Sequence, residues 1–301
     1  MASFGLKVIR SVFGAAEHVL PRLGGRAAFE LFCRTPNAKS LSDGERRAVE
    51  RAAGFMAEAR HHRLKTRKDC VAVHEFRPEP GREARGTVLV IHGWRSRTEY
   101  MRSLIEGFRA AGYKVVSLDL PGHGHSLGRH LNMVNAVDAA RVAGEWFGPF
   151  AAVVGHSFGG AIAANSVAAS VKGLPPLAAQ KLVLIAAPSS LPAIFDDFSD
   201  MMNVGPRSRL AMADRVKHLS GRPLSDFTGD RQLAAAPVPT LIIHAPDDRE
   251  VHADHARRYA GAGEHVRLHW ADGLGHRRIL ADKDVVKRAV GFVTERDATL
   301  H

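Results

Sequence analysis

Six short, nearly unbroken apolar segments constrain the fold of this chain more than any other feature. They read TVLVIHG, YKVVSLDL, FAAVVGHS, KLVLIAAP, TLIIHAPDD and HVRLHWADG, at residues 87–93, 113–120, 150–157, 181–188, 240–248 and 265–273. Strands that are apolar on both faces are typical of a buried parallel sheet. Helical patterns alternate with them, at residues 98–111, 130–147, 158–171, 252–262 and 278–296. This alternation predicts an α/β fold with a doubly wound, mostly parallel sheet and right-handed crossovers.

Two regions fall outside the alternation. Residues 1–66 have a helical pattern and predict an N-terminal helical extension. The connection 189–237 is far longer than a usual link between strands, and it carries Phe and Met side chains at helical spacing. We therefore expect a small helical cap inserted over one end of the sheet. The α/β core is then expected to comprise residues 67–188 and 238–301.

A formal net charge of +11 raises the question of a nucleic-acid or anionic membrane partner. The positive charges are spread along the chain, and the densest group lies between Arg60 and Lys68 without interleaved aromatic residues. Basic runs of this kind are usually solvated faces, so no nucleic-acid partner is expected. The 301 residues allow one large α/β domain, and the charge does not change that interpretation.

The first 25 residues lack the continuous apolar stretch of a signal peptide, and no segment approaches the roughly 20 apolar residues of a membrane span. Apolar residues at helical spacing predict a helix that packs on the domain, which we favour over a membrane anchor. They are Leu6, Ile9, Phe13, Ala16 and Leu20. The two cysteines, Cys33 and Cys70, do not suggest a disulfide framework, although one bridge stays open, and we expect a cytoplasmic location.

One serine stands at the junction of a predicted strand and a predicted helix, in the sequence GHSFGG. Gly155 and Gly159 flank Ser157 in the pattern G-x-S-x-G, which allows a very tight strand–turn–helix. The turn would expose the hydroxyl beside the backbone donors at the start of the helix. A turn that merely needs glycine is the simpler alternative, so the partners of a nucleophile have to be found.

A serine nucleophile needs a base, and the base needs a carboxylate that orients it. Functional side chains of an open parallel sheet gather at the carboxyl ends of its strands. Asp247 and Asp248 follow one predicted strand, and His276 follows the last one. The order Ser157, Asp248, His276 is the order expected on such a sheet, and we favour Asp248 over Asp247 as the acid.

An oxyanion formed at Ser157 would need hydrogen-bond donors. The first long strand ends in IHGW, and Gly93 allows a sharp turn toward the strand end that carries Ser157. We expect the backbone N–H groups of Trp94 and Phe158 to serve as the donors.

With these motifs, residues 70–297 resemble the α/β-hydrolase superfamily. The motifs are HGW, DLPGHGHS, GHSFGG, APDDREV and GLGHRRIL, and they look most like esterase, lipase or lysophospholipase-like members with a helical cap. The resemblance implies Ser157 as nucleophile, His276 as base and Asp248 as acid. It also implies oxyanion donors at Trp94 and Phe158, and neither a metal nor a cofactor. Ala245 stands where many relatives have glycine, and residues before 66 lie outside the core pattern.

The sequence therefore predicts a metal-independent serine hydrolase that acts on a small-molecule carboxylic ester. Hydrolysis of a lactone, thioester, amide or carbon–carbon bond is the alternative on the same residues, and a non-catalytic scaffold is a third. The remaining histidines are interpreted as structural or solvated: His123 and His125 as loop-shaping residues, His252 and His255 as one exposed helix face, and His156 as pointing away from the turn. Physiological substrate and oligomeric state stay open.

Overall fold

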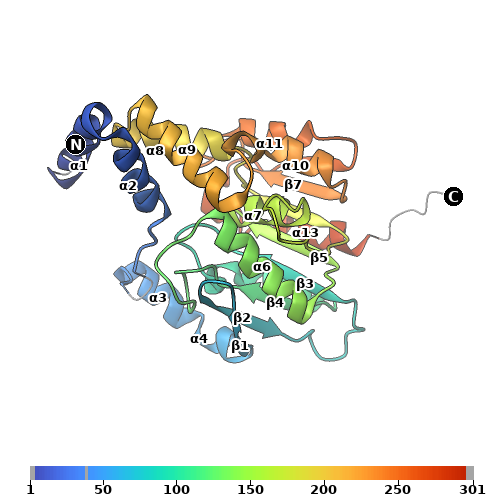
Figure 1. Ribbon diagram of the computed structural model, residues 1–301. Coiled ribbons are helices and arrows are strands. Elements are labelled where there is room, and N and C mark those ends of the chain that lie inside the picture. Colours follow the sequence, from blue (N-terminus) through green and yellow to red (C-terminus); the bar gives the residue numbers. More distant parts are fainter. Residues whose placement is uncertain (1–3, 38–39, 296–301) are drawn as a thin grey trace.

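Eight strands form a single sheet at the centre of the molecule in a computed structural model that describes residues 4–37 and 40–295 (Figure 1). The strands are β1 (Arg60–Lys65), β2 (Cys70–Phe76), β3 (Thr87–Ile91), β4 (Lys114–Leu118), β5 (Ala152–His156), β6 (Leu182–Ile185), β7 (Thr240–His244) and β8 (Val266–Trp270). Their order is β1-β2-β4-β3-β5-β6-β7-β8. Only the β1–β2 and β2–β4 pairs are antiparallel. The predicted doubly wound, mostly parallel sheet is confirmed.

Helices cover both faces of this sheet because its central strands are apolar on both sides. Leu89 and Ile91 of β3 face one apolar core, whereas Val88 and Val90 face the other, as alternation along a strand requires. The first core is completed by α6 (Met133–Phe147), α7 (Phe158–Val167), α10 (Gly229–Ala235) and α11 (Ala253–Ala260). The second is completed by α4 (Ala53–Ala57), α5 (Arg102–Ala110) and α13 (Lys283–Thr294). Outside these two groups lie α3 (Asp43–Arg51), α12 (Gly275–Arg278) and the 3₁₀ turns Thr98–Met101 and Leu224–Asp226.

The chain reverses its direction of travel across the sheet at β3. It passes from β3 to the neighbour β4 on one side and then to β5 on the other. At such a switch point the connections after the two strands leave in opposite directions, which opens a crevice at the carboxyl ends. Trp94 follows β3 and Ser157 follows β5, so both residues lie at this crevice.

The segment before the core differs from its sequence prediction at one end. The helical pattern was expected to continue to about residue 66, but Arg60–Lys65 forms the edge strand β1, paired antiparallel with β2. Only Leu64 of this strand is buried, so the apolar alternation that marks a strand is missing. The exposed Arg60, Arg63 and Lys65 suit an edge strand, because charged side chains discourage pairing with another chain. Ser42 and Glu45 form a capping box at the start of α3.

Two N-terminal helices and two helices of the long connection pack together beside the sheet (Figure 1). They are α1 (Phe4–Val19), α2 (Pro21–Cys33), α8 (Leu191–Met202) and α9 (Pro206–Ser220). The buried carboxylate of Glu17 accepts hydrogen bonds from the backbone N–H groups of Arg207 (2.8 Å) and Ser208 (2.9 Å), which fixes α1 at the start of α9. We propose that α2, α8 and α9 together form the cap, because α2 packs closely on α9. Helix α10, although it belongs to the connection 189–237, packs on α7 and α11 and is therefore assigned to the core.

Helix α1 packs on the domain, as predicted, but only through part of the predicted face. Phe13 is buried, whereas Ile9 and Leu20 are 37% and 56% exposed. Within the described ranges, no helix combines the length and the apolar character that crossing a bilayer requires.

The contact between α2 and α9 depends on a residue without a side chain. A Cβ at Gly25 would lie 2.3 Å from the backbone oxygen of Ser208 and 2.6 Å from the Ala211 Cβ. We predict that Gly25→Ala lowers the free energy of unfolding by about 1–3 kcal/mol, since the two backbones must separate. The matched change Gly291→Ala in α13, where the added Cβ meets open space, should raise it by up to about 1 kcal/mol. Urea unfolding of both variants measures the difference, and equal stabilisation by the two changes would contradict the tight helix contact.

Candidate active site

Ser157 occupies a strained turn between β5 and α7. Its φ of 54° and ψ of −129° lie outside the regions that residues with a side chain normally adopt. The turn is held by the hydrogen bond from the Ser157 N–H to the Ile185 carbonyl (2.9 Å) and by close packing of α7 on β3. A Cβ at Gly159 would lie 2.2 Å from the Ile91 oxygen, so this approach requires glycine. The predicted turn is thus present and leaves the serine side chain half-buried.

The structure brings Ser157, His276 and Asp248 into one hydrogen-bonded chain. His276 lies in the one-turn helix α12, and its Nε2 is 3.0 Å from the Ser157 Oγ. Its Nδ1 is 2.7 Å from the Asp248 Oδ2. A carboxylate can only accept, so Nδ1 carries the proton and Nε2 of the neutral ring is left to accept from the hydroxyl. This is the arrangement that lets an imidazole take the proton of a serine.

Asp248 is held as an anion in a buried position. Burial alone would raise its pKa, but the hydrogen bonds from His276 and from the Val251 N–H outweigh that effect and lower the pKa. Its Oδ1 accepts from the backbone N–H groups of Glu250 (2.8 Å) and Val251 (2.9 Å). Asp247, the alternative, instead receives a long hydrogen bond of 3.4 Å from the Gly275 N–H.

His156, the residue before Ser157, supports the backbone of His276. The ring is buried, and its Nε2 donates to the backbone carbonyl of His276 at 2.9 Å. Burial lowers the pKa of His156 to about 3, so the ring stays neutral beside His276. It does not enter the cavity described below, but sequence reasoning missed this contact because it joins residues 120 positions apart.

The loop after β3 lies directly against the serine. A Cβ at Gly93 would stand 2.7 Å from the Ser157 Cβ, which shows how closely the loop approaches. Buried His92 donates from Nδ1 to the Gly93 carbonyl (2.8 Å) and accepts at Nε2 from the Leu120 N–H (3.0 Å), which fixes the loop. Phe158 is the first residue of α7, so its N–H has no acceptor within the helix. Trp94 and Phe158 therefore both lie beside Ser157.

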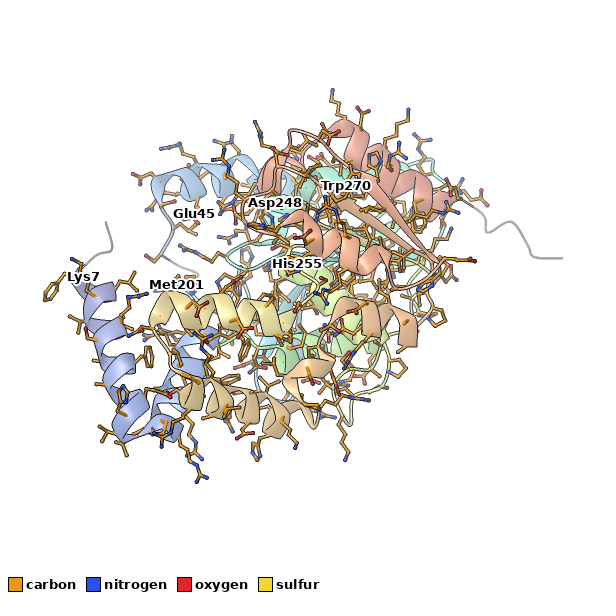
Figure 2. All side chains as sticks on the ribbon, turned by 90° about the horizontal axis from the view of Figure 1, so that it is seen from above. Lys7, Glu45, Met201, Asp248, His255 and Trp270 are labelled. Carbon is orange, nitrogen blue, oxygen red and sulfur yellow. The ribbon has the colours of Figure 1, made fainter. Side chains whose placement is uncertain are left out.

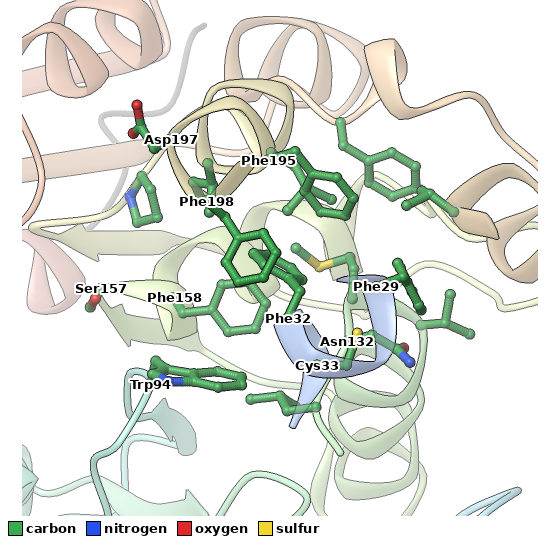
Figure 3. A pocket seen from close by; sticks show the side chains of 18 of the residues that line it. Phe29, Phe32, Cys33, Trp94, Asn132, Ser157, Phe158, Phe195, Asp197 and Phe198 are labelled. Atoms are coloured by element: carbon green, nitrogen blue, oxygen red, sulfur yellow. The ribbon is translucent and has the colours of Figure 1, made fainter. Parts of the chain in front are cut away.

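An apolar cavity of about 480 Å³ begins at Ser157 and extends under the cap (Figure 3). In this view Ser157 lies at one end, and Phe29 and Asn132 lie at the other. Its wall includes Phe195 and Phe198 of α8, but Met202 of the same helix is not part of it. The cavity can receive a group with several apolar atoms while a bond at one end reaches Ser157.

Residues 88–289 match the model of the alpha/beta hydrolase family, which is more than half of the chain. The chain belongs to the alpha/beta hydrolase family. No curated protein matches the sequence.

Solved structures of other hydrolases share the fold at low identity. Carboxylesterase CesB from Bacillus subtilis is 16% identical over 83% of this chain and 96% of its own, with a TM-score of 0.61. Naproxen esterase from the same organism is 16% identical over 84% and 99%, with a TM-score of 0.57. A membrane phospholipase A is 18% identical and covers 96% of both chains, with a TM-score of 0.59. These likenesses establish the fold of the hydrolase.

Sequence reasoning missed part of the cavity wall of this hydrolase. Phe29, Phe32 and Cys33 of α2 line the cavity, although the N-terminal extension lies outside the family pattern. The Phe32 ring packs against Phe195 and Phe198, with ring centroids 4.6 Å and 5.1 Å apart. Burial raises the pKa of the Cys33 thiol to about 12, so this cysteine is no competing nucleophile.

His255 also departs from its expected position. The sequence placed it on a solvated helix face, but it is half-buried and lines the cavity, where its Nδ1 accepts from the Ser189 N–H at 3.1 Å. Burial lowers its pKa.

One group of side chains in the described part of this hydrolase has a donor set that a metal ion could use: His74, Asp119 and His125. The Asp119 carboxylate is, however, already saturated by hydrogen bonds. Its Oδ1 accepts from the N–H and hydroxyl of Thr98, and its Oδ2 accepts from the His125 N–H (2.8 Å) and His74 Nε2 (3.1 Å). The group therefore needs no ion to be satisfied, and it joins the loops that follow β3 and β4.

Asp119 gives a pH-dependent test of this network. Burial would raise its pKa, but hydrogen bonds from His125 and His74 hold it well below the ordinary range, while Asp119 raises the pKa of His125. Asp119→Asn should lower the free energy of unfolding by about 2–4 kcal/mol at pH 7. The difference in unfolding free energy between wild type and variant should grow toward pH 5, because His125 becomes protonated there and pairs with Asp119 only in the wild type.

Below about pH 4 this difference in unfolding free energy should shrink, because Asp119 then binds a proton in the unfolded state while it stays ionised in the folded state. Denaturant unfolding at pH 7, 5 and 3 measures both limbs, with Asp214→Asn on the exposed face of α9 as the control. A deficit that is the same at all three pH values would contradict a charged, hydrogen-bonded Asp119.

Proposed function

We propose that this hydrolase cleaves carboxylic esters through an acyl-enzyme formed on Ser157. The proposal rests on one observation above all: the Ser157 Oγ lies 3.0 Å from an imidazole nitrogen that is free to accept, at the mouth of an apolar cavity. In the first step Oγ attacks the ester carbonyl while His276 Nε2 takes its proton. The protonated ring then gives the proton to the leaving alcohol.

The remaining groups stabilise the charges that develop in this reaction. Asp248 stays ionised and holds the imidazolium through its 2.7 Å hydrogen bond. The backbone N–H groups of Trp94 and Phe158 donate to the oxyanion of the tetrahedral intermediate. A water molecule, deprotonated by His276, then attacks the acyl-enzyme and releases the acid. The roles need neither a metal nor a cofactor.

The cavity supports an apolar acyl group as the part of the substrate that is recognised. Aromatic side chains from α2, α7 and α8 line it, and they bury methylene groups without a hydrogen-bonding requirement. Hydrolysis of thioesters, lactones, amides or carbon–carbon bonds uses the same catalytic groups, so the bond type is decided by assay.

Ser157→Ala tests the nucleophile. The variant should fold normally and lose kcat/KM for p-nitrophenyl esters by at least about 10³-fold, since no other group can form the acyl-enzyme. Ser166→Ala, a buried serine within α7, is the matched control and should keep near wild-type activity. If Ser157→Ala retains more than roughly a tenth of the wild-type rate, the nucleophile lies elsewhere. Thioester and amide substrates in the same assay decide the bond type.

Phe198→Ala tests the acyl pocket. Removing this ring enlarges the cavity, so longer esters should gain relative to shorter ones. Two additional buried methylenes at about 0.8 kcal/mol each correspond to a roughly tenfold change in the ratio of kcat/KM values. Met202→Ala, on the same helix but outside the cavity wall, should leave the chain-length profile unchanged. Identical profiles for both variants would place the acyl group outside this cavity.

A further inference from the structure

Exposed apolar side chains are concentrated at one corner of the molecule. Eleven large apolar residues are exposed in the described part of the chain, and seven of them lie in α1, the start of α2 and the residue between the two helices. These seven, named here the α1 apolar surface, are Phe4, Val8, Ile9, Val12, Val19, Leu20 and Leu23. Phe4 and Val19 are 84% and 75% exposed. A cluster of this kind usually marks a binding surface.

Helix geometry places four of these residues on one side of α1. Phe4, Val8, Val12 and Val19 follow one another at intervals of four, four and seven residues, which is one face of a helix with 3.6 residues per turn. Phe13 and Glu17, on the other side, are buried against the cap. The helix is thus attached through its inner face and presents its apolar face outward. Figure 2 shows it at the edge of the molecule, with Lys7 near its N-terminal end.

Positive charges predominate around the α1 apolar surface. In α1 and α2 the exposed or half-buried side chains Lys7, Arg10, Arg22 and Arg26 outnumber the carboxylates, which are the buried Glu17 and the exposed Glu30. Lys7, Arg22 and Arg26 are exposed. An outward apolar face with cationic borders is typical of helices that lie in a membrane interface. The net charge of +11 favours the same anionic partner.

We propose that the α1 apolar surface docks on an anionic lipid bilayer. Phe4, Val8 and Val12 enter the boundary between headgroups and acyl chains, while Lys7 and the arginines of α2 contact lipid phosphates. A second copy of the chain is a poorer occupant. Two such surfaces facing each other across a two-fold axis would bring like charges together.

Docking would bring the cavity close to its substrate. Helix α2 carries Leu23 of the exposed surface and, less than three turns later, Phe29 and Phe32 of the cavity wall. The bilayer would then supply ester lipids to Ser157, an inference that rests on the proposed function. The docking itself does not rest on it.

Vesicle flotation of the full-length chain tests the proposal. The Ser157→Ala form is used, so that hydrolysis cannot alter the vesicles. It should float with phosphatidylcholine vesicles that contain phosphatidylglycerol, and at least tenfold less with pure phosphatidylcholine. Val8→Glu/Val12→Glu should reduce flotation at least tenfold, whereas Trp146→Glu, a 68% exposed apolar residue on α6, should not.

Two further measurements keep the outcomes distinct. Val8→Glu/Val12→Glu in the active enzyme should keep wild-type hydrolysis of a water-soluble ester, which shows that it folds. Equal flotation of this variant and the parent, or none by the parent, overturns the proposal. So does a dimer, seen by light scattering, that Val8→Glu/Val12→Glu abolishes. If the wild-type chain hydrolyses no ester at all, the proposed function is refuted, but the flotation result still stands.

Discussion

The strained turn at Ser157 is the constraint on which the rest of the site depends. A residue with a side chain at φ 54° and ψ −129° costs about 1–3 kcal/mol, and it persists only where its surroundings leave no alternative. Strand β5 and helix α7 supply those surroundings, because both are buried and packed on their neighbours. The turn brings the hydroxyl to the crevice and, at the same time, leaves the first N–H groups of α7 facing it. The same strained turn thus exposes the Ser157 hydroxyl and places the start of α7 beside it.

The parallel sheet then assembles groups that are far apart in the chain. Ser157, Asp248 and His276 follow β5, β7 and β8, whose carboxyl ends lie at one edge of the sheet. Buried polar contacts hold this edge together: Asp119 joins the loops after β3 and β4, and His156 holds the backbone of His276. The Asp119 and Asp248 carboxylates each accept several hydrogen bonds, which limits the freedom of the loops that carry the site.

The sequence predicts this edge well because local patterns determine it. Apolar strands, glycines at a turn and polar residues at strand ends all lie within a few positions of one another. Long-range packing is different. Edge strand β1 has no apolar alternation, and the place of Phe32 in the cavity depends on the contact of Gly25 with α9, which no periodicity reveals. Helix α1 has apolar residues on two sides, so only the structure distinguishes buried Phe13 from exposed Val12.

The account's central claim is that Ser157 receives the acyl group and that the cavity under α2 and α8 holds it. The most direct measurement is a crystal structure of the enzyme inactivated by a long-chain p-nitrophenyl alkylphosphonate. The account predicts phosphorus bonded to the Ser157 Oγ, one phosphoryl oxygen within hydrogen-bond distance of the Trp94 and Phe158 N–H groups, and the alkyl chain between Phe32 and Phe198. A phosphonate on another side chain, or an alkyl chain that lies outside this cavity, would contradict it.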